Sequence, residues 1–414
     1  MSDTDILNTI KVSWIFEYPQ TVFQKLTCTS LPIGAIAILF VIFILKIDRK
    51  NNPNNDSIFY RVQQLDLLGA SILLPAIVML LLALQWGGST YPWKDSRIIG
   101  LFVGFACMMI VFGYVQYRLG DNGTMPPRLF KDHNIVAALV FSFFFGAGFF
   151  ALIFYIAIYF QSVKGSSATR SGIEILPLLL AVVFSSMATG GLISVTGRYT
   201  PILIVCMVLF AIGSGLITTF NIETTMGRWI GYQLLAGLGI GSGFQGGILV
   251  IQTVMPLSDV PIGTTAVSFC QQLGGAVFVS VSQTVFANGL LSGLQANAPS
   301  LDPMIFLHSG ATSIRPILAD LHAEEQLESV LKAYVRGLSN CFWIAVACAI
   351  CAFITACTLD WKNIKKGHGQ DKPTDEEAAG EAPPGLEASA ESALGNGAAE
   401  ASAKAEALTD AKNE

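Results

Sequence analysis

The sequence is dominated by uncharged apolar runs of about 20 residues, the helix length that crosses the roughly 30 Å hydrocarbon core of a bilayer. Backbone amides in lipid need partners within their own segment, and the alternation typical of membrane β-barrels is absent, so each run is predicted to be a helix. The predicted spans are 31–45, 67–85, 98–117, 135–160, 173–195, 201–220, 229–253, 264–287 and 341–359. The predicted fold class is an all-α integral membrane protein with about nine transmembrane helices.

Composition narrows the classes of partner. Charged residues make up 13% of the chain, against about 25% in an ordinary soluble domain. The acidic excess lies in residues 361–414, which hold 11 acidic and 6 basic residues. Without a basic face the chain cannot neutralise nucleic acid phosphates, so nucleic acid is excluded as a partner. The apolar runs make the lipid bilayer the expected surroundings. Of the cysteines, only Cys28 lies outside an apolar run, which excludes a secreted disulfide framework.

Lysine and arginine residues in the connections predict the orientation. Basic residues follow the first, third and ninth predicted spans, which places these connections in the cytoplasm together with glycosylation sequons at Asn55 and Asn122. An odd number of spans then places Met1 outside and Glu414 inside. Residues 1–30 form neither a signal peptide nor a span. Residues 361–414 are expected to form a disordered acidic cytoplasmic tail.

The predicted spans offer little catalytic chemistry. Spans 135–160 and 201–287 contain no Asp, Glu, Lys, Arg or His within their apolar runs, so we expect no metal site and no hydrolytic site. Cys348 and Cys351 are interpreted as packing residues. A GxGxxG spelling begins at Gly241, but it lies inside a span with no preceding strand, so a dinucleotide loop is rejected. Close helix packing is predicted instead for Gly237, Gly239, Gly241, Gly243 and Gly247.

Amides and a phenol inside the spans are the candidate substrate contacts. Buried amides favour faces turned toward protein or a water-filled cavity. With the phenylalanines of span 135–160 they would suit hydrophobic small molecules. The candidates are Tyr155, Gln233, Gln245, Gln252, Gln271 and Gln272. The alternative is that the glutamines bond neighbouring helices and the phenylalanines face lipid.

Two carboxylates at span ends are candidates for proton coupling. Asp66 precedes the second predicted span and Glu174 lies in the first turn of the fifth. Both positions also suit a helix N-terminus, where the helix dipole and capping favour a carboxylate. Both interpretations stay open.

The connections contain motifs that resemble a known family. The segment from Gly190 to Gly197 and Arg198 resembles a degenerate copy of the major facilitator loop signature G-x-L-a-D-r-x-G-r, with Ser194 at the acidic position. This identifies a candidate conformational loop at Gly190, Gly197 and Arg198. Further segments resemble the fourteen-span fungal drug:proton antiporters: Leu65-Asp-Leu-Leu-Gly69, Leu84-Gln-Trp-Gly-Gly88, Pro126-Pro-Arg-Leu-Phe130, Ser171-Gly-Ile-Glu-Ile-Leu-Pro177, Gly231-Tyr-Gln233, Val260-Pro-Ile-Gly-Thr264 and Gln272-Leu-Gly-Gly275.

The resemblance implies a major facilitator-type helical bundle and a domain order. Residues 31–45 match the last helix of the N-terminal half, 65–117 are two linking spans, and 135–360 are the C-terminal six-helix half. Family members export hydrophobic toxins, secondary metabolites or drugs by alternating access, with the proton gradient as energy source and no cofactor or metal. Multidrug antiport in the plasma membrane is therefore expected, with the vacuolar membrane as the alternative location.

Residues 1–30 depart from the family's pattern, and its first five spans have no counterpart here. We therefore expect an N-terminally truncated exporter, with a partner chain supplying the missing N-terminal half. The alternative function is an inactive or regulatory half-transporter that pairs with a full-length relative. A membrane enzyme is disfavoured because the spans lack acid–base residues.

One further helix is expected outside the spans. Leu327, Val330, Leu331, Tyr334, Val335 and Leu338 fall at helical spacing. They predict an amphipathic helix docked on the outer membrane interface.

Overall fold

The computed structural model describes residues 66–361, except 89, 121–126, 258, 309 and 311. The predicted first span at 31–45, residues 1–30, both sequons and the tail beyond Trp361 lie outside the described residues. Within the described ranges, regular structure is helical apart from one isolated bridge between Gly87 and Tyr91.

Eight stretches of the described chain are long and apolar enough to cross a membrane. Eight of the nine predicted spans are thus confirmed as helices. The span-forming helices are α3 (Leu67–Trp86), α4 (Ser96–Leu119), α5 (His133–Ser162), α6 (Ala168–Glu174) continued by α7 (Leu176–Thr196), α8 (Thr200–Ile217), α9 (Met226–Val254), α10 (Val260–Asn297) and α13 (Leu327–Cys357). Shorter elements are η2 (Pro127–Phe130), α11 (Pro303–His308), α12 (Ile314–Asp320) and η3 (Glu324–Gln326).

Capping residues explain where several spans begin. The carboxylates of Asp66, Asp95 and Asp132 each accept a hydrogen bond from a backbone N–H in the first turn of α3, α4 and α5. Helices α7, α8 and α10 have a proline in their first turn instead, where the missing N–H costs nothing. At the end of α7, Gly197 adopts a left-handed conformation with φ of 69°.

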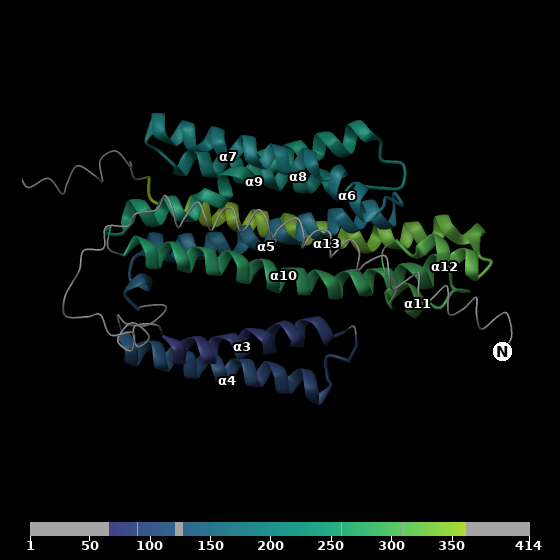
Figure 1. Ribbon diagram of the computed structural model, residues 1–414, viewed down its shortest axis with the longest axis horizontal. Helices are drawn as coiled ribbons and strands as arrows, with labels where there is room; N and C mark the ends of the chain where they lie inside the picture. Colours follow the sequence, from purple (N-terminus) through teal and green to yellow (C-terminus); the bar gives the residue numbers. More distant parts are fainter. Residues whose placement is uncertain are drawn as a thin grey trace, which may run out of the picture. The chain divides into compact units, whose positions relative to one another are not determined.

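Six of the spans pack in a three-plus-three pattern (Figure 1). Helix α5 packs on α10 and α13, and α9 packs in the same way on α7 and α8, while α8 and α13 contact each other. This repeat of three helices against three is the arrangement within each half of a major facilitator transporter. The core runs between these helices, around buried Phe141, Phe145 and Phe210.

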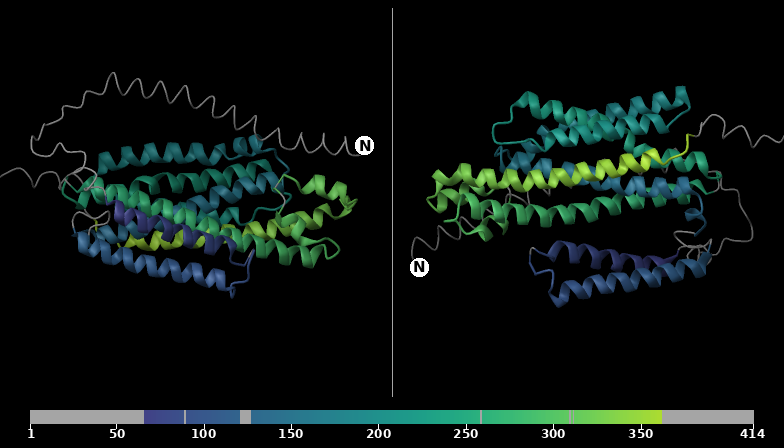
Figure 2. Two further views of the ribbon diagram at one scale, coloured as in Figure 1. Left: turned by 60° about the horizontal axis from the view of Figure 1, so that its bottom comes forward. Right: turned by 180° about the vertical axis from the view of Figure 1, so that it is seen from behind.

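Helices α3 and α4 form a hairpin that lies beside α10 (Figures 1 and 2). The Thr284 hydroxyl of α10 donates to the Leu84 carbonyl at 3.0 Å, which fixes the contact near the hairpin turn. The Arg97 guanidinium lies 4.8 Å from the centre of the Tyr91 ring within this turn.

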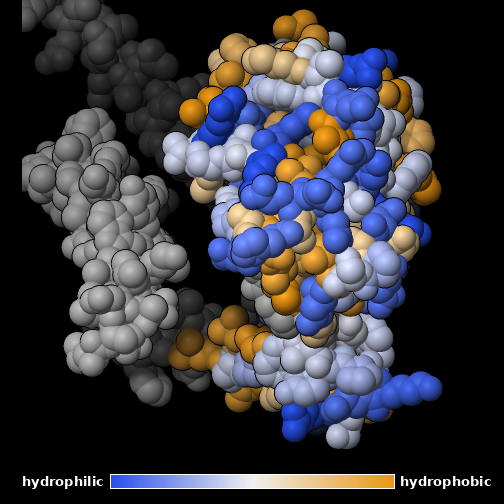
Figure 3. All heavy atoms as spheres, turned by 90° about the vertical axis from the view of Figure 1, so that its right-hand side faces the viewer, coloured by the Kyte–Doolittle hydropathy of each residue, from blue (hydrophilic) through white to orange (hydrophobic). Residues whose placement is uncertain are grey.

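The last two spans are longer than predicted. Helix α10 has 38 residues, so at about 1.5 Å per residue it is about 57 Å long and exceeds the bilayer core. Its end and the start of α13 are joined by residues 298–326, here called the outer cap, because the predicted orientation places this connection outside. Figure 3 views the molecule from this end, where hydrophilic side chains are frequent.

The predicted interfacial helix is corrected. Residues 327–338 are helical, but they form the first turns of α13 and continue into the last span. Val330, Tyr334 and Leu338 are buried in the core. The Tyr334 hydroxyl donates to the Phe306 carbonyl of α11 at 3.1 Å. The prediction of a helix is therefore confirmed, but its position on the membrane interface is wrong. The apolar stripe packs on protein, because α10 and the outer cap lie beside it.

Candidate functional site

Aromatic rings link α5 to α9 near the middle of both helices. The Phe244 ring of α9 lies 5.2 Å from Phe145 and 4.9 Å from Phe149 of α5, edge to face. Phe145 also contacts Phe210 of α8 at 6.3 Å. Such ring pairs add about 0.5–1.5 kcal/mol beyond simple burial. These contacts hold α5 and α9 together and leave Phe244 partly exposed.

A second aromatic group joins α5 to α10. Phe143 and Phe144 are 5.5 Å apart, and their rings lie 6.1 and 6.5 Å from Phe278 of α10. All three side chains are half-buried. We call Phe143, Phe144, Phe149, Phe244 and Phe278 the aromatic layer. The sequence prediction missed Phe244 and Phe278, because single phenylalanines in apolar runs carry no signal of which helix they meet.

The structure does not gather the predicted glutamines into one cavity. The Gln245 amide of α9 donates to the Ser186 hydroxyl of α7 at 2.9 Å, and its side chain is half-buried, one residue after Phe244 of the aromatic layer. Gln271 is half-buried on α10, and its backbone lies against Gly146 of α5. Gln252 and Gln272 are exposed on α9 and α10. Of these four, Gln245 has the position best suited to meet a ligand.

Gln233 lies away from the aromatic layer, where α9 faces the α6–α7 junction. Its side chain is fully buried, and its amide donates to the Glu174 carbonyl at 3.1 Å. Its Oε1 is buried without a hydrogen-bond partner among the described residues. An unsatisfied buried acceptor is costly, so this position suits a bound water or another donor.

Glu174 is the centre of a polar cluster at the outer end. Its carboxylate accepts a hydrogen bond from the Ser166 hydroxyl at 2.7 Å and pairs with Arg170 at 3.2 Å. The Lys164 ammonium donates to the carbonyls of Ile222 and Thr224, both at 2.8 Å. Burial lowers the pKa of Lys164, and the Glu174 charge partly offsets this shift. The cluster thus contains one carboxylate with access to water and to protein donors.

Asp66, the other proton-coupling candidate, is held inside the α3–α4 hairpin. Its carboxylate accepts from the Gly69 N–H at 2.7 Å and from the Gln116 amide of α4. Gln116 is buried. The geometry therefore gives Asp66 a capping and bridging role.

The predicted packing glycines of α9 lie against four neighbouring helices, α5, α7, α8 and α10. A Cβ at Gly237, Gly239 or Gly241 would come within 2.5 Å of a backbone carbonyl oxygen of α7 or α8. Gly243 faces the Phe145 ring, and Gly247 faces α5 and α10. Only residues without a side chain permit this approach.

The candidate conformational loop is only partly a loop: Gly190 lies within α7, whereas Gly197 and Arg198 lie in the connection between α7 and α8. Gly197 supplies its left-handed turn, and Arg198 is exposed. A Cβ at Gly190 would lie 3.7 Å from Gln245 Oε1, so the motif begins beside the amide that joins α7 to α9. Ser194 bonds back to the Gly190 carbonyl at 2.9 Å.

Tyr155 lines a cavity of about 380 Å³ at the outer end. The cavity lies between the α3–α4 hairpin, α5, α10 and α11. Its lining residues are Gln85, Trp86, Thr90, Phe154, Tyr155, Ile158, Gln283, Phe286, Ala287 and Leu307. We call it the hairpin pocket.

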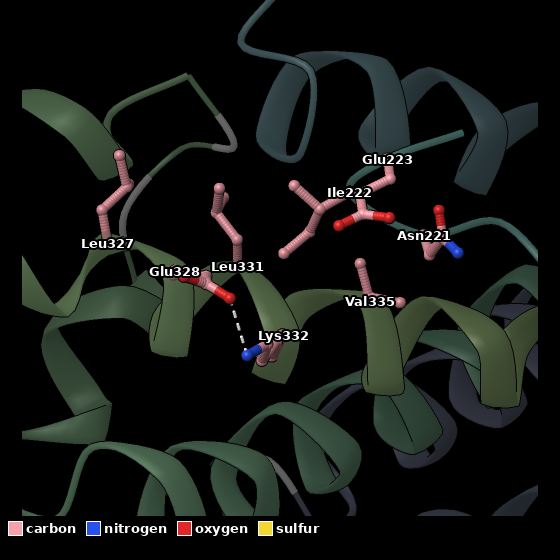
Figure 4. A pocket seen from close by; sticks show the side chains of 8 residues that line it. All are labelled: Asn221, Ile222, Glu223, Leu327, Glu328, Leu331, Lys332 and Val335. Carbon is pink, nitrogen blue, oxygen red and sulfur yellow. Dashed lines mark ion pairs between the residues drawn. The ribbon is translucent and has the colours of Figure 1, made fainter. Parts of the chain in front are cut away.

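Further cavities lie at the outer end, two of them beside span-forming helices. A groove of about 770 Å³ between α7 and α9 is apolar except for Arg170 and Glu174. A pocket of about 520 Å³ lies between the α8–α9 connection and the start of α13, where Glu328 and Lys332 form an ion pair of 2.7 Å (Figure 4). The side chains of Glu328 and Lys332 are well exposed, so their ion pair contributes little to the stability of the fold.

Among the described residues no group of His, Cys, Asp or Glu could hold a metal ion. Cys348 is buried within α13, in keeping with packing.

The helices and their neutral interior define a multi-pass membrane protein of the helical-bundle class. Comparison with known proteins gives the family. The model of the fungal trichothecene efflux pump (TRI12) family matches residues 32–300. The chain belongs to this family of major facilitator efflux pumps.

Two relatives in sequence agree with this assignment. An MFS-type efflux pump, MFS1, of Arthroderma benhamiae is 43% identical over 81% of this chain and 62% of its own length. The efflux pump aflT of Aspergillus parasiticus is 35% identical over 81% of this chain and 65% of its own. The chain thus spans less than two thirds of these two relatives. A solved bacterial homologue of the human lysosomal transporter Spinster aligns with a TM-score of 0.39 at 13% identity, over 65% of this chain and 61% of that one.

Proposed function

We propose that this protein exports neutral hydrophobic small molecules across the plasma membrane by alternating access, in exchange for protons. The family assignment supports the transport class, since the relatives are efflux pumps. The observation that carries the substrate class is the aromatic layer, in which all rings but Phe149 are half-buried, with Gln245 following Phe244 on α9. Aromatic rings with a few amides fit uncharged polycyclic compounds of varied shape.

The proton-coupling part of the proposal rests on Glu174. Its carboxylate is partly exposed, and it contacts a hydroxyl, a guanidinium and, through its carbonyl, the buried amide of Gln233. Protonation would weaken the contact with Arg170 and so alter the junction between α6 and α7. Asp66 is less suited, because its carboxylate serves the hairpin.

The test is transport by the purified protein in proteoliposomes. The probe is 1,8-dihydroxyanthraquinone, a planar, uncharged three-ring compound. Vesicles that are acidic inside should accumulate the probe, carried by those protein molecules whose cytoplasmic side faces the bath. An ionophore that collapses the proton gradient should stop the accumulation. Uptake that is the same with and without the gradient would contradict proton-coupled export.

A further inference from the structure

The Gln-Trp-Gly-Gly motif at residues 85–88 has a structural position that the aromatic layer does not explain. Its first two residues end α3 and its two glycines begin the turn of the α3–α4 hairpin, and this end of the hairpin closes one side of the hairpin pocket. We infer that the hairpin pocket is a second binding site, which holds the exported compound at the outer end of the protein. This inference rests on the proposed export function.

The pocket is fixed in place by contacts of the turn. The Thr284 hydroxyl of α10 donates to the Leu84 carbonyl at 3.0 Å and to the Gly87 carbonyl at 3.3 Å. Thr284 itself is buried. Gly88 adopts a φ of 75°, which allows the chain to reverse its direction. Its backbone N–H donates to the Tyr91 carbonyl at 2.8 Å. The turn therefore places Trp86, whose ring lies 6.2 Å from that of Tyr91, in the wall of the pocket.

The lining selects a chemical class of ligand. Four aromatic side chains line the pocket, of which Phe154 and Tyr155 are 5.3 Å apart and Tyr155 and Phe286 are 5.9 Å apart. The amides of Gln85 and Gln283 add hydrogen-bonding groups, and none of the lining residues carries a charge. A volume of about 380 Å³ falls in the usual range for small-molecule sites. The fitting ligand is a planar, uncharged polycyclic compound with carbonyl or hydroxyl groups.

The position of the pocket gives its role. It lies beside the outer cap, since Leu307 of α11 is part of its lining. The aromatic layer lies nearer the middle of α5, and Phe150 and Phe154 follow it along the same helix toward the pocket. A compound that leaves the aromatic layer toward the outside therefore meets the hairpin pocket next.

The test measures binding separately from transport. The full chain in lipid nanodiscs is dialysed to equilibrium with 1,8-dihydroxyanthraquinone, and the bound probe is read from its own absorbance. Trp86→Ala should weaken binding about 3- to 10-fold, the worth of a ring contact. Gln283→Leu should weaken it about 2- to 10-fold. Trp343→Ala is the matched control, because Trp343 is exposed on α13 and outside the pocket.

A conservative variant locates the probe. Trp86→Phe keeps an aromatic wall, so affinity should stay within about twofold, while quenching of tryptophan fluorescence by the probe should fall more than in Trp343→Phe. Melting temperatures of all variants in the nanodisc exclude loss of folding as the cause.

Failure of this inference differs from failure of the proposed function. Gradient-driven uptake with unchanged binding in Trp86→Ala and Gln283→Leu would overturn the second site alone. Binding that falls in both pocket variants, without gradient-driven uptake, would overturn the export proposal and leave the pocket standing. Undetectable binding, or binding lost only in Gln245→Leu, would also overturn the pocket as a site for this class of ligand.

Discussion

Asn134 and Asp360 form a reciprocal pair that ties the start of α5 to the end of α13. The Asn134 amide donates to the Asp360 carboxylate at 2.8 Å, and its carbonyl oxygen accepts from the Asp360 backbone N–H at 3.0 Å. Asn134 is buried, and the Asp360 carbonyl also accepts from the Thr200 hydroxyl of α8 at 3.1 Å. Asp360, which follows the last span, thus joins α5, α8 and α13 at their inner ends.

Replacing Asn134 should therefore loosen this end of the bundle. Asn134→Ala leaves the Asp360 N–H without its partner and should destabilise the protein by about 1–3 kcal/mol. Asn134→Asp should cost more, because it places a second carboxylate beside Asp360. Combining it with Asp360→Asn restores a donor and should recover much of the loss. Thermal unfolding in detergent measures the effects, with Ser268→Ala, at an exposed position of α10, as control. A double variant no better than Asn134→Asp would contradict the pairing.

The glycines of α9 allow a second test with a control on the same helix. Gly239→Ala places a Cβ against the α8 backbone, 2.5 Å from the Cys206 carbonyl oxygen. Such overpacking should cost about 1–3 kcal/mol. Gly231→Ala meets nothing within 4 Å, so it should stabilise the helix by up to about 1 kcal/mol. Equal melting temperatures for the two variants would show that α8 and α9 are not in close contact.

Glu174 should decide the response to the proton gradient. Glu174→Gln keeps the side-chain shape but removes the titrating group. Probe uptake should therefore no longer respond to the proton gradient, while exchange of probe across the membrane without a gradient continues. Arg170→Gln removes the ion pair alone. Because the Arg170 side chain is 74% exposed, this change should cost less than about 1 kcal/mol and leave coupling intact. Gradient-driven uptake that survives Glu174→Gln would exclude this carboxylate as the coupling group.

Gln245 should affect ligand binding beyond its effect on helix packing. Ser186→Ala removes the partner of the Gln245 amide, and each single change should cost about 0.5–1.5 kcal/mol of stability. If Gln245 also contacts the ligand, Gln245→Leu should weaken binding of the anthraquinone probe severalfold more than Ser186→Ala does. Equal affinities in the two variants would show that Gln245 serves only to join α7 and α9.

The sequence predicted the helices well because an uncharged run of span length has one stable structure in lipid. It placed the end of the α10 span too early, at 287, and the start of the α13 span too late, at 341. The reason is that the outer cap is held by contacts such as that of Tyr334 with Phe306, whose partners lie 28 residues apart in the sequence. Gln245 was found by residue type, whereas its partner Ser186 depends on the register between α7 and α9. Likewise, Tyr155 was predicted as a ligand contact, but the cavity that it lines together with Trp86 depends on the position of the hairpin turn, to which Thr284 binds.

The extension of α10 and α13 beyond the membrane has a practical consequence. Transporters built mainly of spans offer few rigid surfaces outside a detergent micelle, so particle images are hard to align. Here two continuous helices carry the outer cap, with Phe306, Ile314 and Leu318 buried within it. A nanobody raised against the cap would therefore keep a fixed orientation relative to the spans, and could serve as a fiducial for electron cryomicroscopy of the protein in each transport state.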